Sequence, residues 1–405
     1  MNKALISSCL VMMYLAGPLH AQSLTVTSRA EQIEEERLAK AATIPAVPPP
    51  ATQALLPRTL DLIDRLFYGY PLRLRMGGLP GGSGLALGPL VQWRNDPDTT
   101  IFTTSAIGSF RKVYGGDAAV ETNFANRRLS LIVDGGYFNK PQFDYYGPGP
   151  DSSKADRTQF LEENTTADLA LRWQPDKQRH FTAGARIGGL FVNVGPTPND
   201  RFPSTETVFS PAETPGIDNQ TNFLVSAGLI DIQYLDLANV PTSGARGTVT
   251  FEHYADLKLK GFTFNRATAQ VEGYIPFFNK KRVIAMRAGT ALSFKDPDQL
   301  VPFYLQPTLG GPQDLRGYRR WRFYDNNSMI FTVEYRYEVS TGFVMALFSD
   351  AGQVFSRASQ ISWTKMQSDV GFGLRMHARD RYGLRIDMGF SHEGFQAWLQ
   401  VQNIF

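Results

Sequence analysis

From about Tyr68 to the C-terminus, apolar and polar residues alternate with a period of two. In residues 382–390, one set of alternate positions is apolar: Leu384, Ile386, Met388 and Phe390. The other set is charged or glycine: Gly383, Arg385, Asp387 and Gly389. Side chains of a β-strand point alternately to its two faces, so this segment predicts a strand with one apolar and one polar face.

The same alternation recurs along the chain and predicts sixteen strands. Residues 328–339 and 370–376 repeat it, with Ile330 as an exception. The expected segments are 69–77, 84–94, 100–112, 116–125, 127–139, 158–174, 179–195, 222–236, 244–257, 262–277, 282–295, 327–339, 342–356, 368–378, 382–393 and 395–405. An even count is what a single-chain bacterial outer-membrane barrel requires.

Two architectures use strands of this kind. A soluble sandwich turns its apolar faces inward, whereas a transmembrane barrel turns them toward lipid. Here the polar faces are charged and rich in glycine, as a wet lumen allows, and the apolar faces carry aromatic residues at both ends. We therefore expect an all-β fold, a 16-stranded antiparallel transmembrane β-barrel over residues 68–405, in the bacterial outer membrane.

The connections between these segments alternate between short and long. The short turns 174–178, 237–244 and 279–282 are expected on the periplasmic side, and loops 140–157 and 196–221 outside. A barrel of sixteen strands is wide enough for an aqueous channel unless something fills it. The long loop 296–326 is the candidate, because a loop of this length usually has a function or its own packing.

Residues 1–21 have the pattern of a secretory signal peptide. A short basic start is followed by an apolar stretch from Ala4 to Gly17 and then by a small residue at Ala21. Cys9, the only cysteine, lies inside it, so no disulfide is expected in the exported chain.

Residues 22–67 are expected to form a periplasmic extension, with a helix near 29–42 and a proline-rich linker after it. Two interpretations of this extension stay open. It is either a disordered tail with one marginal helix, or a helix that docks on something downstream.

Composition narrows the class of protein. With 41 Lys+Arg against 38 Asp+Glu, the net charge of +3 gives no reason to expect nucleic-acid binding. No internal run reaches the roughly 18 apolar residues of a membrane-spanning helix, while 28 Phe, 16 Tyr and 36 Gly fit an all-β chain.

Candidate chemistry is sparse. Besides His20 in the expected signal peptide, the histidines His180, His253, His377 and His392 are scattered without metal-ligand spacing. Gly81-Gly82-Ser83-Gly84-Leu85 lacks the last glycine of a lipase nucleophile elbow and lies in an expected hairpin loop. We expect no catalytic residue, metal or cofactor. The charged alternate positions of the strands either line a catalytic or selective site, or form a solvated lumen with ladder ion pairs.

Several short motifs, in one order, carry a resemblance to a known family. They are Pro241-Thr242-Ser243-Gly244, Leu309-Gly310-Gly311, Leu315-Arg316-Gly317-Tyr318, Glu334-Tyr335-Arg336, Phe348-Ser349-Asp350-Ala351-Gly352, Gly371-Phe372-Gly373-Leu374-Arg375 and the terminal Phe405. Over residues 222–405 the chain resembles the bacterial surface antigen superfamily, the BamA/TamA-type barrels of outer-membrane assembly and two-partner secretion. A terminal strand ending in an aromatic residue also resembles the signal by which the barrel assembly machinery recognises outer-membrane barrels.

The resemblance implies that the long loop folds back into the lumen. Its motif would be Leu315, Arg316, Gly317 and Tyr318, and the wall that receives it would include Phe348, Asp350, Gly371, Gly373 and Glu334. The expected contact is an Arg316–Asp350 ion pair. From the residues alone, Arg316 could equally belong to an exposed basic loop near lipopolysaccharide phosphates. If the ion pair is solvated, it would stabilise the fold by about 0–1 kcal/mol. If it is desolvated, removing one partner would destabilise the fold by about 3–5 kcal/mol.

Three functions follow as hypotheses. The resemblance implies a barrel that inserts or transports proteins, with a client or periplasmic protein as partner. Relatives with that role usually carry periplasmic receiving domains, for which residues 22–67 offer little room. The alternatives are a gated or passive channel and a structural surface-antigen barrel. Outer-membrane lipids and lipopolysaccharide are expected partners, a homo-oligomer is left open, and no enzyme activity is expected.

Overall fold

A computed structural model describes residues 36, 70–76, 86–95, 99–176, 178–378 and 381–400. The expected signal peptide at 1–21, all of the extension 22–67 except Glu36, and the terminal Phe405 lie outside the described residues. The strands all belong to one compact unit of the chain.

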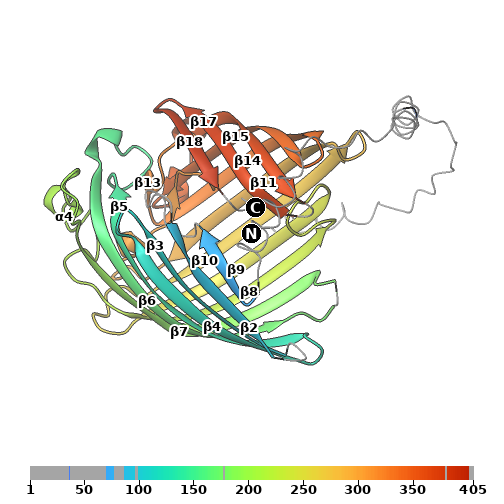
Figure 1. The fold of residues 1–405 in the computed structure, drawn as a ribbon. Helices are drawn as coiled ribbons and strands as arrows, with labels where there is room; N and C mark the ends of the chain where they lie inside the picture. The colour runs from blue at the N-terminus through green and yellow to red at the C-terminus, as the bar shows by residue number, and fades with distance from the viewer. Residues whose placement is uncertain are drawn as a thin grey trace, which may run out of the picture. The chain divides into compact units, whose positions relative to one another are not determined.

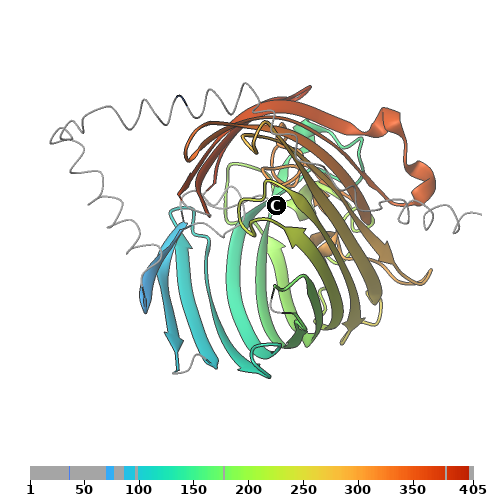
Figure 2. The ribbon, with the colours of Figure 1, turned by 90° about the vertical axis from the view of Figure 1, so that its right-hand side faces the viewer.

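Within the described residues, sixteen strands form a single antiparallel sheet in chain order, which confirms the all-β fold (Figure 1). The strands are β1 (Leu72–Met76), β2 (Ala86–Arg94), β3 (Thr100–Ser109), β4 (Tyr114–Phe124), β5 (Leu129–Tyr145), β6 (Thr158–Trp173), β7 (Phe181–Pro196), β8 (Phe223–Leu235), β9 (Gly244–Asp256), β10 (Phe264–Phe277), β11 (Arg282–Phe294), β14 (Asn327–Ser340), β15 (Phe343–Phe355), β16 (Gln367–Ala378), β17 (Arg381–Ser391) and β18 (Gly394–Gln400). Figure 2 shows this sheet curving round as a barrel wall.

Two details differ from the sequence expectation. Strand β5 continues to Tyr145 instead of ending near residue 139, because a bulge between Lys140 and Phe143 takes up Pro141, which has no N–H to donate to a ladder. The long loop also contains a two-stranded antiparallel pair, β12 (Thr308–Leu309) and β13 (Phe323–Tyr324). Strands of two residues are too short to be recognised as alternation in the sequence.

The two ends of the sheet differ in their connections. Consecutive strands run in opposite directions, so the connections alternate between the ends. One end has tight turns such as 278–281 and 341–342. The other has the longer loops, whose described residues include four 3-10 turns and one helix: η1 (Lys154–Asp156), α4 (Thr205–Val208), η2 (Phe303–Leu305), η3 (Ala358–Gln360) and η4 (Trp363–Lys365).

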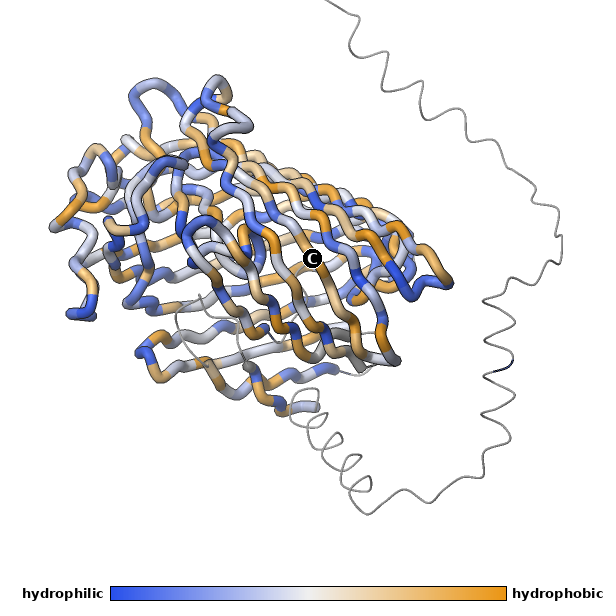
Figure 3. The backbone as a smooth tube through the Cα atoms, turned by 90° about the horizontal axis from the view of Figure 1, so that it is seen from above, coloured by the Kyte–Doolittle hydropathy of each residue, from blue (hydrophilic) through white to orange (hydrophobic). Residues whose placement is uncertain are grey.

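The two faces of the sheet have opposite character. Phe343, Met345 and Leu347 of β15 are exposed on the outer face, while Phe348 and Asp350 are buried on the inner face. Hydrophobic and hydrophilic positions alternate along the strands in Figure 3. An apolar outer face with a charged inner face is the arrangement of a transmembrane barrel. No helix in the described part of the chain is long and apolar enough to span a membrane.

Apolar residues of the long loop pack against strands that are distant in the sheet order. Phe303, Tyr304 and Tyr324 form one buried cluster with Tyr145 of β5 and Phe160 of β6. The rings of Phe303 and Phe160 lie 4.9 Å apart, edge to face. These contacts join β5 and β6 to a loop between β11 and β14, so the loop crosses the interior of the sheet.

Candidate functional site

The tip of the long loop is a compact turn built on two glycines. Gly310 and Gly311 have φ values of 112° and 115°, where L side chains are strained. The N–H of Gly311 donates to the carbonyl of Leu315 at 3.1 Å, and the N–H of Trp321 donates to the carbonyl of Gly310 at 3.2 Å. Leu315 is buried in a cluster with apolar residues of β14 and β15. This packing fixes the position of the next residue, Arg316.

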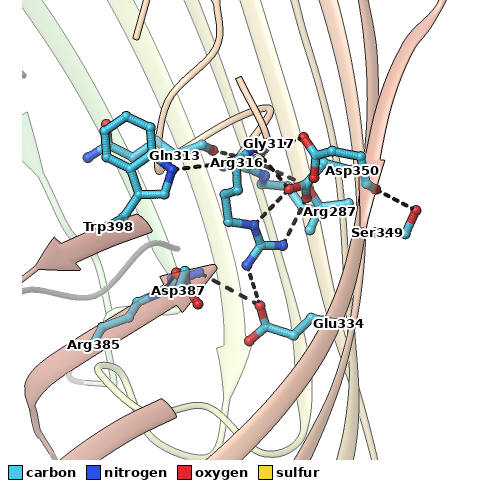
Figure 4. A network of polar contacts seen from close by, with 12 residues as sticks. Arg287, Gln313, Arg316, Gly317, Glu334, Ser349, Asp350, Arg385, Asp387 and Trp398 are labelled. Atoms are coloured by element: carbon cyan, nitrogen blue, oxygen red, sulfur yellow. Dashed lines mark hydrogen bonds and ion pairs between the residues drawn. The ribbon is translucent and has the colours of Figure 1, made fainter. Parts of the chain in front are cut away.

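Arg316 reaches the middle of the inner wall and binds two carboxylates (Figure 4). Its Nε and Nη2 donate to the two oxygens of Asp350, at 2.7 and 2.9 Å, and its Nη1 donates to Oε2 of Glu334 at 2.7 Å. Only 2% of Arg316 is exposed, and neither carboxylate is exposed. The structure thus brings together Arg316, Asp350 and Glu334 in a desolvated, bidentate geometry, which is the stronger form of such contacts.

Glu334 is shared among several arginines of the wall. Besides Arg316, it accepts from Nε of Arg336 at 2.8 Å and from Nη2 of Arg375 at 2.9 Å. Arg375 also donates to Asp387 at 2.8 Å. Buried charges of this kind are tolerated only when they are paired and hydrogen-bonded. The loop arginine therefore belongs to an ion-pair network that extends from β14 to β17.

Phe348 and Gly371 form the surface beneath the guanidinium. The centre of the guanidinium of Arg316 lies 3.4 Å from the centroid of the Phe348 ring. The ring occupies the space beside Gly371, where an added Cβ would overlap it. Gly371 and Gly373 both differ from the expectation of a bare wall that the loop approaches. The space at Gly371 is filled by Phe348 and the carbonyl of Met388. A Cβ at Gly373 would meet Asp387 and Arg375, so both glycines receive atoms of the wall and not the loop.

The loop also contacts the C-terminal hairpin, which is the pair β17–β18. The indole Nε1 of Trp398 donates to the carbonyl of Arg316 at 2.7 Å, and Oγ of Ser391 donates to the carbonyl of Gly317 at 2.9 Å. The N–H of Gly317 donates to Asp369 of β16 at 2.9 Å. Gly389 lets the loop backbone approach, because a Cβ there would lie 2.5 Å from the carbonyl of Arg316.

Tyr318 and Arg322 extend these contacts to the end of the hairpin. The hydroxyl of Tyr318 donates to the carbonyl of Ser368 at 3.2 Å and lies 3.0 Å from Nδ1 of His392. Burial raises the pKa of Tyr318 to about 12. Arg322 binds Glu393 through Nε at 2.9 Å. All four residues of the expected loop motif are therefore buried against the wall or the hairpin.

Several partners of the loop were not predicted from the sequence, and three of them lie on the inner face of the strands: Asp369, Gly389 and Trp398. The signal that identifies them is the strand register. Asp369 pairs with Asp350, Gly389 pairs with Gly371, and Trp398 pairs with Asp387, so all three continue rows of the inner face. Alternation within one strand identifies a face but does not say which residues of neighbouring strands lie opposite one another.

Gly389→Ala should displace the loop from the wall. The added methyl would overlap backbone atoms of Arg316 and Gly317, and overpacking of this kind usually costs about 1–3 kcal/mol. We expect faster trypsin cleavage in the loop at Arg319 or Arg320. Gly273→Ala in β10 is the matched control, since its Cβ would meet nothing within 4 Å. Equal cleavage of both variants and the unmodified protein would contradict the close approach.

The chemistry of the site is ionic and structural. Within the described ranges, no group of three or more His, Cys, Asp or Glu is arranged to hold a metal ion. The arginines and carboxylates hold one another, and the arrangement can fix a loop on the wall.

A long antiparallel sheet with an apolar outer face, a charged inner face and an inserted loop defines the class of transmembrane β-barrels. Residues 113–391 match the model of the Omp85 superfamily domain, which is more than half of the chain. The chain therefore belongs to the Omp85 superfamily. The match confirms the resemblance drawn from the loop and strand motifs.

Solved structures share this fold. BamA from Haemophilus ducreyi lacking POTRA domains 1-3 has 14% sequence identity and a TM-score of 0.60, and the match covers 86% of this chain and 78% of that one. CdiB from Escherichia coli has 12% identity and a TM-score of 0.51, covering 86% of this chain and 68% of that one. At these identities the likeness shows the fold alone. No curated protein sequence matches the chain.

Proposed function

We propose that this protein acts in outer-membrane protein insertion or protein transport, by opening its sheet beside the C-terminal hairpin. One observation carries the proposal: a single loop residue, Arg316, contacts both the middle of the wall and the strand β18. It binds Glu334 and Asp350 through its guanidinium and Trp398 through its carbonyl. The superfamily and the BamA-like fold support the same role.

The sheet has two edges at which such an opening would occur. Among the described residues, β1 pairs only with β2, and β18 pairs only with β17. An unpaired edge exposes backbone N–H and C=O groups that accept another strand. A client strand, or strand β1 itself, would satisfy these groups on β18.

The two kinds of contact made by Arg316 differ in strength. Three charged hydrogen bonds from its guanidinium hold it on β14 and β15, whereas Trp398 contributes one neutral hydrogen bond. Charge-assisted bonds are roughly twice as strong as neutral ones. Movement of β18 would therefore break the contact with Trp398 first and leave the loop in place on the wall. We propose no covalent chemistry for this site.

Depletion of the protein in its native host tests the role. We expect quantitative proteomics of the outer membrane to show a broad fall in unrelated barrels or the loss of one secreted protein. Expression of the unmodified protein should restore the normal levels of outer-membrane and secreted proteins. The Gly389→Ala variant should restore these levels less completely than Gly273→Ala. Unchanged levels of outer-membrane and secreted proteins after depletion would contradict a role in insertion or transport. Conductance measurements on the purified barrel would then test the alternative of a gated or passive channel.

A further inference from the structure

A basic groove lies at the end of the sheet that carries the longer loops. Its cavity of about 400 Å³ is formed by the β3–β4 turn, the ends of β5 and β6, and the loop that follows β7. We call it the basic groove and define it by the residues that line it: Phe110, Arg111, Lys112, Pro141, Gln142, Arg157, Gln159, Pro198, Asn199, Arg201 and Phe202. It shares no residue with the site around Arg316.

The charge of the basic groove is of one sign. Four of its lining residues are Lys or Arg and none is Asp or Glu. Arg157 is partly neutralised by Asp144, at 2.8 Å, and its guanidinium lies 3.9 Å from the ring of Phe202. Arg201 lies over the same ring at 5.5 Å. Clustered cations with polar amide neighbours favour an anion with several oxygens, such as a phosphate group.

The basic groove faces outward from the barrel. Tyr145 of β5 and Phe160 of β6 point inward, since they pack on Phe303 of the long loop. Their neighbours Asp144 and Gln159 therefore point to the outer face, because side chains alternate along a strand. Gln159 bonds to Asn199 at 2.7 Å, and Arg157 bonds to Asp144, which places both groove residues on that outer side.

The strands that lead to the basic groove carry lipid-facing aromatic residues. Tyr114 and Tyr137 are exposed on β4 and β5, with ring centroids 6.3 Å apart. Aromatic girdles of barrels lie at the membrane interface. Phe110, which lines the groove from the β3–β4 turn, is 90% exposed. The groove thus lies on the lipid side, just beyond an aromatic belt, at the level of lipid head groups.

We infer that the basic groove binds the phosphate groups of a phosphorylated glycolipid, such as lipopolysaccharide, in the outer leaflet. Lys112 and Arg201 would contact the phosphates, and Phe110 would lie against the acyl chains or the sugar edge. The inference rests on the outer-membrane location and the outward face of the groove. It does not depend on the proposed role in protein insertion or transport.

Charge reversal in the purified, detergent-solubilised protein tests the inference. Lys112→Glu combined with Arg201→Glu should bind lipopolysaccharide about tenfold more weakly than the unmodified protein, since basic residues near an anionic lipid surface each contribute appreciably to binding. The matched control is Lys258→Glu combined with Lys260→Glu, at the same end of the barrel. Lys260 has a φ of 59°, close to the 61° of Lys112, and all four side chains are exposed.

The following results decide the assignment. Loss of binding in the groove variant alone, with heat-modifiable migration unchanged, supports it. The assignment is overturned if both variants bind lipopolysaccharide as tightly as the unmodified protein, or if both lose binding to the same extent. Dephosphorylated lipopolysaccharide that binds as tightly as the intact lipid, or inorganic phosphate that binds as tightly as the lipid, overturns the assignment to a phosphorylated glycolipid.

Discussion

Replacing Arg316 with alanine should lower the free energy of unfolding by about 3–5 kcal/mol, because it leaves two buried carboxylates without their shared partner. Glu334 would keep Arg336 and Arg375, but Asp350 would lose both of the charged hydrogen bonds that reach it from Arg316. Urea unfolding of the protein from lipid vesicles measures the change. The same variant should migrate as an unfolded chain at a lower temperature in heat-modifiability gels.

Two further variants separate charge from geometry. Arg316→Lys keeps the charge but lacks the planar fork that binds Asp350 and Glu334 together, so it should recover only part of the loss. Asp350→Ala should resemble Arg316→Ala in loop proteolysis. If both alanine variants keep unmodified stability and protease resistance, the ion pair contributes nothing and the loop is held by its apolar contacts.

Leu347→Arg should cost about 2–4 kcal/mol, since it places a charge on the lipid face near the middle of a strand. The side chain of Leu347 is 60% exposed, and its strand, β15, runs from Phe343 to Phe355. A charged side chain at this position would have to leave water for the hydrocarbon layer. We expect a smaller folded fraction in lipid vesicles, measured by the heat-modifiable band.

Two controls isolate the effect of lipid. Leu347→Ala removes the same side chain without adding a charge, so it should fold nearly as well as the unmodified protein. Leu257→Arg makes the identical change at a position that is 57% exposed in the β9–β10 connection, outside the strands. If Leu347→Arg folds as well as Leu257→Arg, the outer face of β15 does not contact lipid.

The strands could be predicted from the sequence because a lipid-facing wall forces alternation on every strand. In β17, the apolar residues Ile386 and Phe390 are exposed on the outer face, and the alternate residues Arg385 and Asp387 are buried on the inner face, as their alternation in the sequence predicts. The end of β5 could not be placed, since Pro141 interrupts the pattern and only the pairing beyond it shows that the strand resumes.

The candidate site could be predicted only in part. Spacing within the chain cannot pair Arg316 with Asp350, which is 34 positions away, and the expectation came from the family resemblance. The role expected for Gly371 and Gly373 was wrong for a physical reason: a glycine in a strand indicates that something approaches the backbone, but not whether it is a loop or a neighbouring side chain. Trp398 carried no signal, because an aromatic residue near a strand end equally fits an interfacial girdle.

The contacts of Arg316 all come from the last part of the chain. Its partners Glu334, Asp350 and Trp398 lie 18, 34 and 82 positions away, on strands β14, β15 and β18. Contacts of shorter sequence separation need less loop closure and form more readily. The contacts between Arg316 and the C-terminal strands can therefore form before the first strands join the sheet. None of the contacts of Arg316 described above comes from strands β1 to β4, so the gain or loss of a hairpin among those strands would leave the ion-pair network unchanged.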